Sequence, residues 1–177
     1  SRKIYIAPDG GIQKSIGFPE SYSQTNKLVV MRGAQTTILV GFLDDDGALS
    51  AFGPGSDQAE ADSTFVIIGM KEKGKYDTAT YITSASVVAI DAAYYYKITL
   101  PLNNAAIDAL LSVDGDDSND VASEDVMFEV AWSISGGATG ATDWERSHMI
   151  HTEIRNNVIR STDPAVEVAA KGLVWQW

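Results

Sequence analysis

An acidic segment between residues 114 and 125 carries side-chain oxygens at the spacing of a calcium-binding loop. Oxygens stand at alternate positions, and a carboxylate follows where such a loop places its last ligand. The residues that would bind the ion are Asp114, Asp116, Ser118, Asp120 and Asp125. Asn119 stands where the sharp turn of that loop needs glycine, and aspartate replaces the usual final glutamate. A solvated acidic loop is therefore the preferred interpretation, and calcium is the one cofactor that the segment suggests.

No other pattern in the sequence has the spacing of a reaction centre. Residues 44–47, three aspartates and a glycine, have the chemistry of a hairpin turn with exposed carboxylates. His148 and His151 are three residues apart in a predicted strand, so we expect them on opposite faces. Neighbouring carboxylates such as Asp143 and Glu145 are common in an acidic chain and do not define a glycosidase pair. The sequence contains no nucleophile elbow or phosphate-binding loop, and it predicts a protein that is not an enzyme.

Aromatic side chains offer another kind of site, a stacking surface for sugar rings or for a partner protein. The candidates for such contact are Trp144, Tyr95, Trp175 and Trp177. Trp144 follows a glycine-rich stretch, and it could instead pair across a hairpin. Tyr94 and Tyr96 share one face of a predicted strand, which we expect to be core, and Tyr95 lies on the other face.

The strand pattern is clearest between residues 126 and 154. Apolar side chains on one face are Val126, Phe128, Val130, Trp132 and Ile134. Their period of two predicts a half-buried strand. A glycine-rich connection over residues 135–143 leads to a second extended run over residues 144–154. The two runs predict an antiparallel hairpin with a long tip.

Shorter apolar and β-branched runs, separated by turn residues, predict the other strands. They lie at residues 28–31, 36–43, 48–52, 64–71, 80–90 and 94–100. We expect the first two to be strands around a turn, and residues 53–63 to be a polar loop. Residues 103–111 begin with asparagine and have apolar side chains at helical spacing, which predicts one short helix. The sequence predicts an all-β fold, an antiparallel β-sandwich (Ig-like or jelly-roll-like) of about seven to nine strands with one short helix.

Length and charge narrow the remaining possibilities. The 177 residues, 45% of them hydrophobic, suit one domain with its own core. We expect an N-terminal arm over residues 1–27, the sandwich over residues 28–163, and an apolar tail over residues 164–177 that could begin a further segment. The net charge of −11, with scattered basic residues, argues against nucleic acid and membrane as partners. The chain has no cysteine, which excludes disulfides and thiol chemistry.

Several motifs follow one another in a recognisable order. They are Met31-Arg32-Gly33, Thr36-Thr37-Ile38-Leu39-Val40, Phe42-Leu43-Asp44-Asp45-Asp46-Gly47, Tyr95-Tyr96-Lys97-Ile98-Thr99-Leu100, the helical residues 103–111, Phe128-Glu129-Val130-Ala131-Trp132 and Ile154-Arg155-Asn156-Asn157-Val158-Ile159-Arg160. With these motifs the chain resembles the N-terminal β-sandwich domain of phage upper baseplate and tail-fibre proteins, over residues 28–163. Such domains commonly have Gly-Asp after the last motif, whereas Ser161 follows it here. The resemblance therefore says nothing of the course of the chain after Arg160.

The resemblance implies a phage or prophage virion protein that anchors a receptor-binding device to the tail tip by protein–protein contact. It implies other virion or tail proteins as partners, a homo-oligomer, and a soluble protein that is made in the bacterial cytoplasm and located in the phage tail. Two other functions stay open. A carbohydrate-binding module would present Trp144 or Tyr95 to a cell-surface glycan in a groove. A calcium-dependent adhesin-like domain would lose stability when calcium is chelated.

Overall fold

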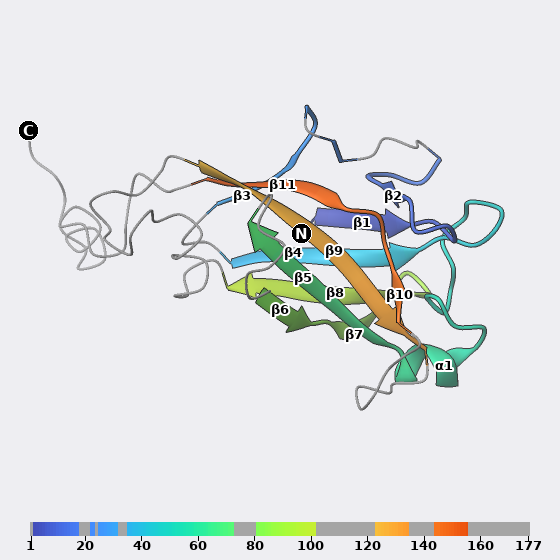
Figure 1. The fold of residues 1–177 in the computed structure, drawn as a ribbon. Coiled ribbons are helices and arrows are strands. Elements are labelled where there is room, and N and C mark those ends of the chain that lie inside the picture. Colours follow the sequence, from blue (N-terminus) through green and yellow to red (C-terminus); the bar gives the residue numbers. More distant parts are fainter. Residues whose placement is uncertain are drawn as a thin grey trace, which may run out of the picture.

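The computed structural model describes residues 2–17, 22–23, 25–31, 35–72, 81–101, 123–134 and 144–155. These residues form two β-sheets that pack face to face around one large apolar core (Figure 1). The predicted all-β, sandwich-like fold is therefore confirmed.

Five strands make the first sheet, in the order β2-β1-β4-β8-β7. Their bounds are β1 Arg2–Ile6, β2 Ile12–Gln13, β4 Gln35–Phe42, β7 Ser86–Ile90 and β8 Ala93–Pro101. β1 runs parallel to β4, with Ile4 opposite Val40, and the other neighbours are antiparallel. Because β1 and β2 belong to this sheet, residues 2–13 are part of the sandwich and not of a separate arm, which differs from the expectation for residues 1–27.

The second sheet has the order β3-β11-β9-β5-β6, and β10 also pairs with β9. Its strands are β3 Leu28–Met31, β5 Phe65–Glu72, β6 Tyr81–Ser84, β9 Ser123–Ser133, β10 Glu145–Arg146 and β11 Ile150–Arg155. β11 runs parallel to β3, with Thr152 opposite Leu28. The remaining pairs of this sheet are antiparallel.

The structure differs in two details from the predicted antiparallel sandwich of about seven to nine strands. The described residues contain eleven strands, and the pairs β1–β4 and β3–β11 are parallel. Alternating side chains identify a strand but carry no information on the direction of its neighbour. Both parallel pairs join segments that are distant along the chain, so no turn signal reveals them.

Two predicted strand neighbours also separate into different sheets. β3 and β4 were expected around a common turn, but β3 belongs to the six-stranded sheet and β4 to the five-stranded sheet. The run predicted over residues 80–90 is divided at Ala85, whose N–H donates to the carbonyl of Val66 at 2.9 Å. β6 therefore extends one sheet and β7 the other, and this segment turns the corner of the sandwich.

The predicted hairpin around β9 is confirmed as far as the structure describes it. β9 pairs antiparallel with β10 and β11, with Phe128 opposite Ile150. The side chains predicted to be core are at most 4% exposed at Val126, Phe128, Val130 and Trp132. The hairpin tip over residues 135–143 lies outside the described residues. β9 also pairs with β5, so it is a central strand.

The core lies between the two sheets. Its largest fully buried side chains are Tyr96, Phe128, Ile4, Ile6, Leu28, Ile38, Ile68, Met70, Ile98 and Leu100. A smaller apolar cluster covers the outer face of the five-stranded sheet, and its buried members are Tyr5, Leu39, Leu43, Ala93 and Tyr95. The five-stranded sheet is thus packed on both faces around these residues, whereas Lys97 and Thr99, on the same outer face of β8, are exposed.

Within the described residues the one helix, α1, spans Gln58–Ser63, inside the stretch expected to be a loop. The Asp57 side chain accepts a hydrogen bond from the N–H of Glu60 at 2.9 Å. The Glu60 carboxylate accepts one from the N–H of Ser56 at 2.6 Å. This reciprocal capping satisfies backbone donors at the start of the helix and so favours it over a loop. The helix predicted over residues 103–111 lies outside the described residues.

The turn between β7 and β8 contains strained backbone. Asp91 and Ala92 have positive φ angles of 49° and 62°, between the paired residues Ile90 and Ala93. A two-residue hairpin turn with two positive φ angles favours glycine, because a Cβ atom crowds the carbonyl in that conformation.

Replacing Ala92 by glycine is expected to stabilise the fold by about 1 kcal/mol, because glycine removes this strain. The control is Ala89→Gly in β7, which we expect to destabilise the fold by about 0.5–1 kcal/mol. At this position there is no strain to relieve, and glycine loses more conformational entropy on folding than alanine does. Urea denaturation of both variants gives the two free energies. Equal effects of the same sign would contradict the proposed strain at Ala92.

Candidate functional site

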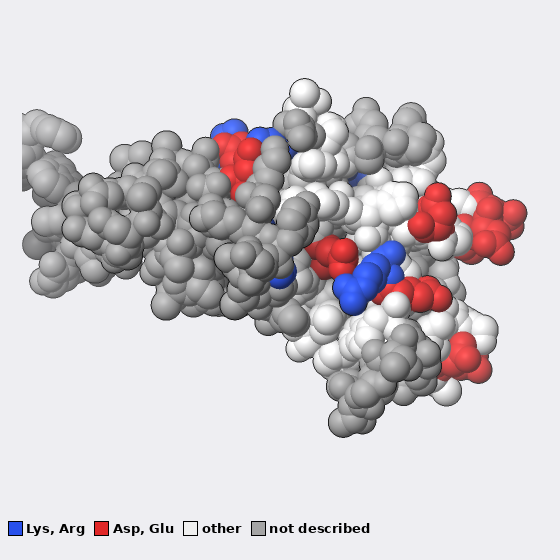
Figure 2. Space-filling model, in the orientation of Figure 1, with Lys and Arg blue, Asp and Glu red and all other residues white. Residues whose placement is uncertain are grey.

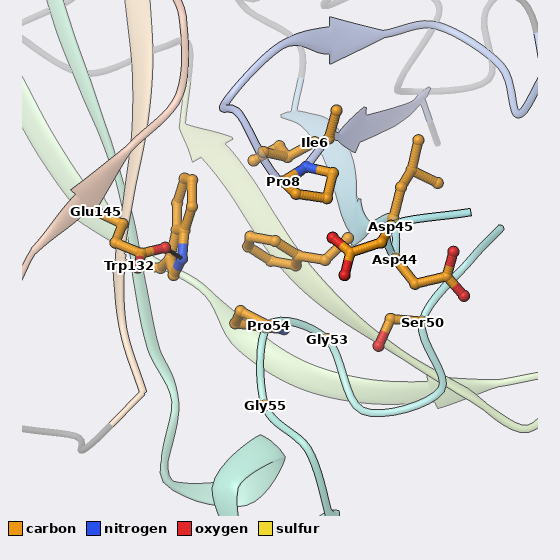
Figure 3. A pocket seen from close by; sticks show the side chains of 13 residues that line it. Ile6, Pro8, Asp44, Asp45, Ser50, Gly53, Pro54, Gly55, Trp132 and Glu145 are labelled. Atoms are coloured by element: carbon orange, nitrogen blue, oxygen red, sulfur yellow. Dashed lines mark hydrogen bonds between the residues drawn. The ribbon is translucent and has the colours of Figure 1, made fainter. Parts of the chain in front are cut away.

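A pocket of about 290 Å³ opens at the end of the sandwich where β1 and β4 finish. It is lined by Ile6, Ala7, Pro8, Phe42, Leu43, Asp44, Asp45, Ser50, Gly53, Pro54, Gly55, Trp132 and Glu145. These residues come from the ends of both sheets and from the loops that follow β1 and β4. Figure 3 shows Trp132 and Glu145 on one side, Asp44 and Asp45 on the other, and Pro8 and Pro54 between them.

The inner wall of the pocket is a cluster of buried aromatic rings. Phe42 contacts Tyr96 and Trp132 edge to face, with ring centroids 5.6 and 5.1 Å apart. Phe42 and Trp132 are each 4% exposed, so little of either ring reaches solvent. Tyr96 is held in turn by a hydrogen bond from its hydroxyl to the carbonyl of Ala61 in α1, at 3.2 Å. This wall is therefore set by the core and does not depend on a ligand.

Glu145 is fixed beside Trp132 by both backbone and side chain. The two residues are opposite each other in the β9–β10 pair. The indole N–H of Trp132 donates to one carboxylate oxygen (Oε2) of Glu145 at 3.0 Å. This bond satisfies the one polar group of a buried ring. It also holds the exposed Glu145 carboxylate at the mouth of the pocket.

The opposite side of the pocket is the turn over residues 44–47, and the predicted turn is confirmed. The N–H of Gly47 donates to the carbonyl of Asp44 at 3.0 Å, and Gly47 has a φ of 78°. The Asp44 side chain also accepts through Oδ1 from the N–H groups of Asp46 and Ala48, at 3.0 and 2.9 Å. These bonds keep the turn rigid and direct exposed carboxylates to one end of the molecule. What the sequence did not indicate is that Asp44 and Asp45 border a pocket.

The pocket is negatively charged. Its lining includes three carboxylates, those of Asp44, Asp45 and Glu145, and no lysine, arginine or histidine from the described residues. Figure 2 shows acidic side chains gathered at this end of the sandwich. The neighbouring cation, Arg146, forms an ion pair with Glu129 at 2.7 Å. The Arg146 guanidinium is thus paired with a carboxylate that does not line the pocket.

Of the four predicted aromatic contact residues, the structure describes Trp144 and Tyr95, and it packs each of them against another ring. Trp144 is half-buried, with its ring 5.8 Å from that of Phe65. Tyr95 is 4% exposed, so the expectation of an exposed Tyr95 in a sugar-binding groove is wrong. The physical reason is the outer apolar cluster, where Tyr5 packs edge to face on Tyr95 with centroids 6.5 Å apart. Trp175 and Trp177 lie outside the described residues.

Burial changes the acid–base behaviour of Tyr95. Removal from water, together with a hydrogen bond with Tyr5, raises the pKa of Tyr95 to about 12. The ordinary pKa of tyrosine is about 10, so below pH 10 both folded and unfolded chains keep the proton. Between about pH 10 and pH 12 the unfolded chain alone loses it, and the free energy of unfolding must fall across that interval.

Replacing Tyr95 by phenylalanine is expected to reduce this alkaline loss of stability. The variant also loses the hydrogen bond with Tyr5, which lowers the free energy of unfolding at every pH. The quantity to compare is therefore the change in the free energy of unfolding with pH, and not its value at one pH. Urea denaturation at pH 9 and pH 11.5 measures it. Parallel losses in the two proteins would show that the Tyr95 proton is not coupled to folding.

Of the five residues proposed to bind calcium, the structure describes only Asp125, and its contacts do not support a calcium site. Asp125 pairs with Lys27, whose Nζ lies 2.6 Å from the Asp125 carboxylate. Asp114, Asp116, Ser118 and Asp120 lie outside the described residues. Among the described residues no group of three potential metal ligands comes together. His151 lies in β11. His148 precedes that strand, and its backbone N–H donates to the carbonyl of Gly10.

Comparisons with known proteins do not assign this chain to a family. No known family model matches the sequence, and no curated protein matches it significantly. In the described part of the chain, no helix has the length and apolar character needed to cross a membrane.

Proposed function

We propose that this chain is a structural module of a phage or prophage tail, from a tail fibre or baseplate, that acts by protein–protein contact. It helps to anchor a receptor-binding device and catalyses no reaction. Its partners are further copies of itself and other tail proteins. The sequence motifs favour this family of functions, and the observation that carries the contact role is the exposed edge at β7.

β7 forms one edge of the five-stranded sheet. It pairs with β8 on one side, with Val88 opposite Tyr95, and no described strand pairs with its other side. Its sequence, Ser-Val-Val-Ala-Ile, has no charge and no proline. Monomeric proteins usually protect such edges with lysine, proline or a bulge, because unpaired backbone groups recruit another strand. An edge strand that lacks charge and proline, and that no described strand pairs with on its outer side, supports a role in assembly.

The side chains around β7 also suit a contact. Val87 is 40% exposed, so an apolar side chain of this edge strand is open to a partner. A second hollow, of about 380 Å³, lies beside the strand and is lined by Thr83, Ser84, Ser86, Val88, Lys97 and Thr99. A partner strand on this edge would bond to the backbone of β7 and place side chains over the hollow. Two copies related by a twofold axis meet this requirement, since each supplies the same edge.

The test is the solution mass of the native chain and of two variants, measured by light scattering over a range of concentrations. We expect the native chain to self-associate and Val87→Lys to have the mass of one chain, because a lysine on the edge opposes strand pairing. Ile16→Lys is the control, since Ile16 is 42% exposed and lies outside β7. A monomeric native chain, or equal masses for both variants, would contradict self-assembly through β7.

A further inference from the structure

We infer that the pocket at the end of the sandwich receives an arginine side chain from a partner protein. The inference rests on the proposed function, because it names the chemistry of one protein contact. It concerns a different surface from β7, and the two can be tested separately.

The size of the pocket suits a single side chain. About 290 Å³ is at the lower limit of pockets for small molecules, which usually measure about 300–1,000 Å³. Pro8, which is exposed, and Pro54, which is half-buried, supply apolar surface along its walls. Arginine buries its methylene stem against such surface and keeps its charged group near water. The apolar walls therefore suit the methylene stem of arginine, and the acidic mouth suits its guanidinium group.

The charges at the mouth select a cation with several donors. One oxygen of Glu145 accepts from Trp132, and Oδ1 of Asp44 accepts two backbone bonds, so each carboxylate keeps an oxygen for a ligand. Asp45 also borders the pocket. Carboxylates only accept hydrogen bonds, and a guanidinium offers five donors in a planar fork. The fork can bond to one carboxylate through two N–H groups, which the compact ammonium of lysine does less well.

The same lining disfavours a sugar. Sugar-binding sites need an exposed ring face for stacking, but Phe42 and Trp132 are each only 4% exposed. A sugar hydroxyl can donate to these carboxylates, but among the lining side chains it finds few donors to accept from, since the one side-chain hydroxyl is that of Ser50. An excess of acceptors with no cationic donor is complementary to a positively charged group.

The experiment uses N-acetyl-arginine amide as the probe and the indole N–H resonance of Trp132 as the reporter. Trp132→Phe identifies that resonance in the nitrogen–proton spectrum, because it removes one of four indole signals. We expect a saturable shift on addition of the probe, with weak affinity, on the order of millimolar, as for one side chain alone. The neutral analogue N-acetyl-citrulline amide should give no saturable shift.

Matched variants locate the binding site. Asp45→Asn and Glu145→Gln should each weaken binding of the probe about fivefold, because each removes one charge from the mouth. Asp62→Asn, an exposed residue of α1 that does not line the pocket, should leave the affinity unchanged. Equal responses to arginine and citrulline probes, equal effects of all three variants, or a saturable shift with methyl glucoside alone would overturn the inference.

Repeating the titration with Val87→Lys separates this inference from the proposed function. If Val87→Lys abolishes self-association but no probe binds either protein, the inference about the pocket alone fails. If the probe binds both proteins and neither self-associates, the pocket stands and assembly through β7 fails.

Discussion

Replacing Trp132 by alanine is expected to lower the free energy of unfolding by about 3–5 kcal/mol, the cost of truncating a buried aromatic residue. Trp132 is 4% exposed, packs edge to face on Phe42, and joins the core between the two sheets. Its removal leaves a cavity at the point where β9 meets the end of β4. It also leaves Glu145 without the indole N–H that holds it at the pocket.

Trp144→Ala is the matched control for this change. Trp144 is half-buried and contacts Phe65, so its truncation should cost clearly less. Urea denaturation of the two variants gives the comparison, and Trp132→Phe tests whether a smaller ring restores part of the loss. A Trp132→Ala variant that is as stable as Trp144→Ala would contradict the placement of Trp132 in the core.

Replacing Gly41 by valine is expected to cost about 3 kcal/mol, in the upper part of the range for overpacking. A Cβ atom at Gly41 would lie 3.0 Å from the Leu49 side chain and 3.1 Å from the rings of both Tyr5 and Tyr95. The glycine therefore lets these three side chains meet above β4. Valine adds two further methyl groups to a space that is already full.

The sign of the stability change in Gly41→Val shows whether side-chain packing or strand propensity decides the outcome at this position. Valine favours strands, and glycine within a strand is unfavourable, so local preference alone predicts a gain in stability at Gly41. The control Ala89→Val makes a related change at an exposed position of β7, where we expect little effect. Denaturation curves decide the question, and a Gly41→Val protein as stable as the native chain would show that the outer cluster is not packed as described.

Local patterns were sufficient to predict the strands and turns that their own residues determine. The alternation around Phe128 and Trp132 predicted β9 because a half-buried strand repeats every two residues. The run ending at Gly47 predicted a turn because it contains the residues that a turn requires. The helix α1 had a comparable signal in Asp57 and Glu60, which form the capping pair, but the polar composition of the segment favoured a loop.

Contacts between distant segments could not be predicted in the same way. The three apolar residues of β1 form too short a run to indicate that Ile4 would pair in parallel with Val40. The pocket depends on Pro8, Asp45 and Trp132, which lie far apart in the sequence and meet only through the packing of the sheets. Burial of Tyr95 similarly depends on Tyr5 from β1, since its own strand has no feature that distinguishes a covered face from an exposed one.

Amide hydrogen exchange in β7 at low and high protein concentration measures directly whether this edge pairs with a second copy. We expect the amides of residues 86–90 to exchange more slowly at high concentration, because a second copy pairs with that edge. β9, a central strand of the other sheet, should exchange at the same rate under both conditions because both of its edges are already paired. Concentration-independent exchange in β7, or equal slowing in β9, would contradict a contact module that assembles through β7.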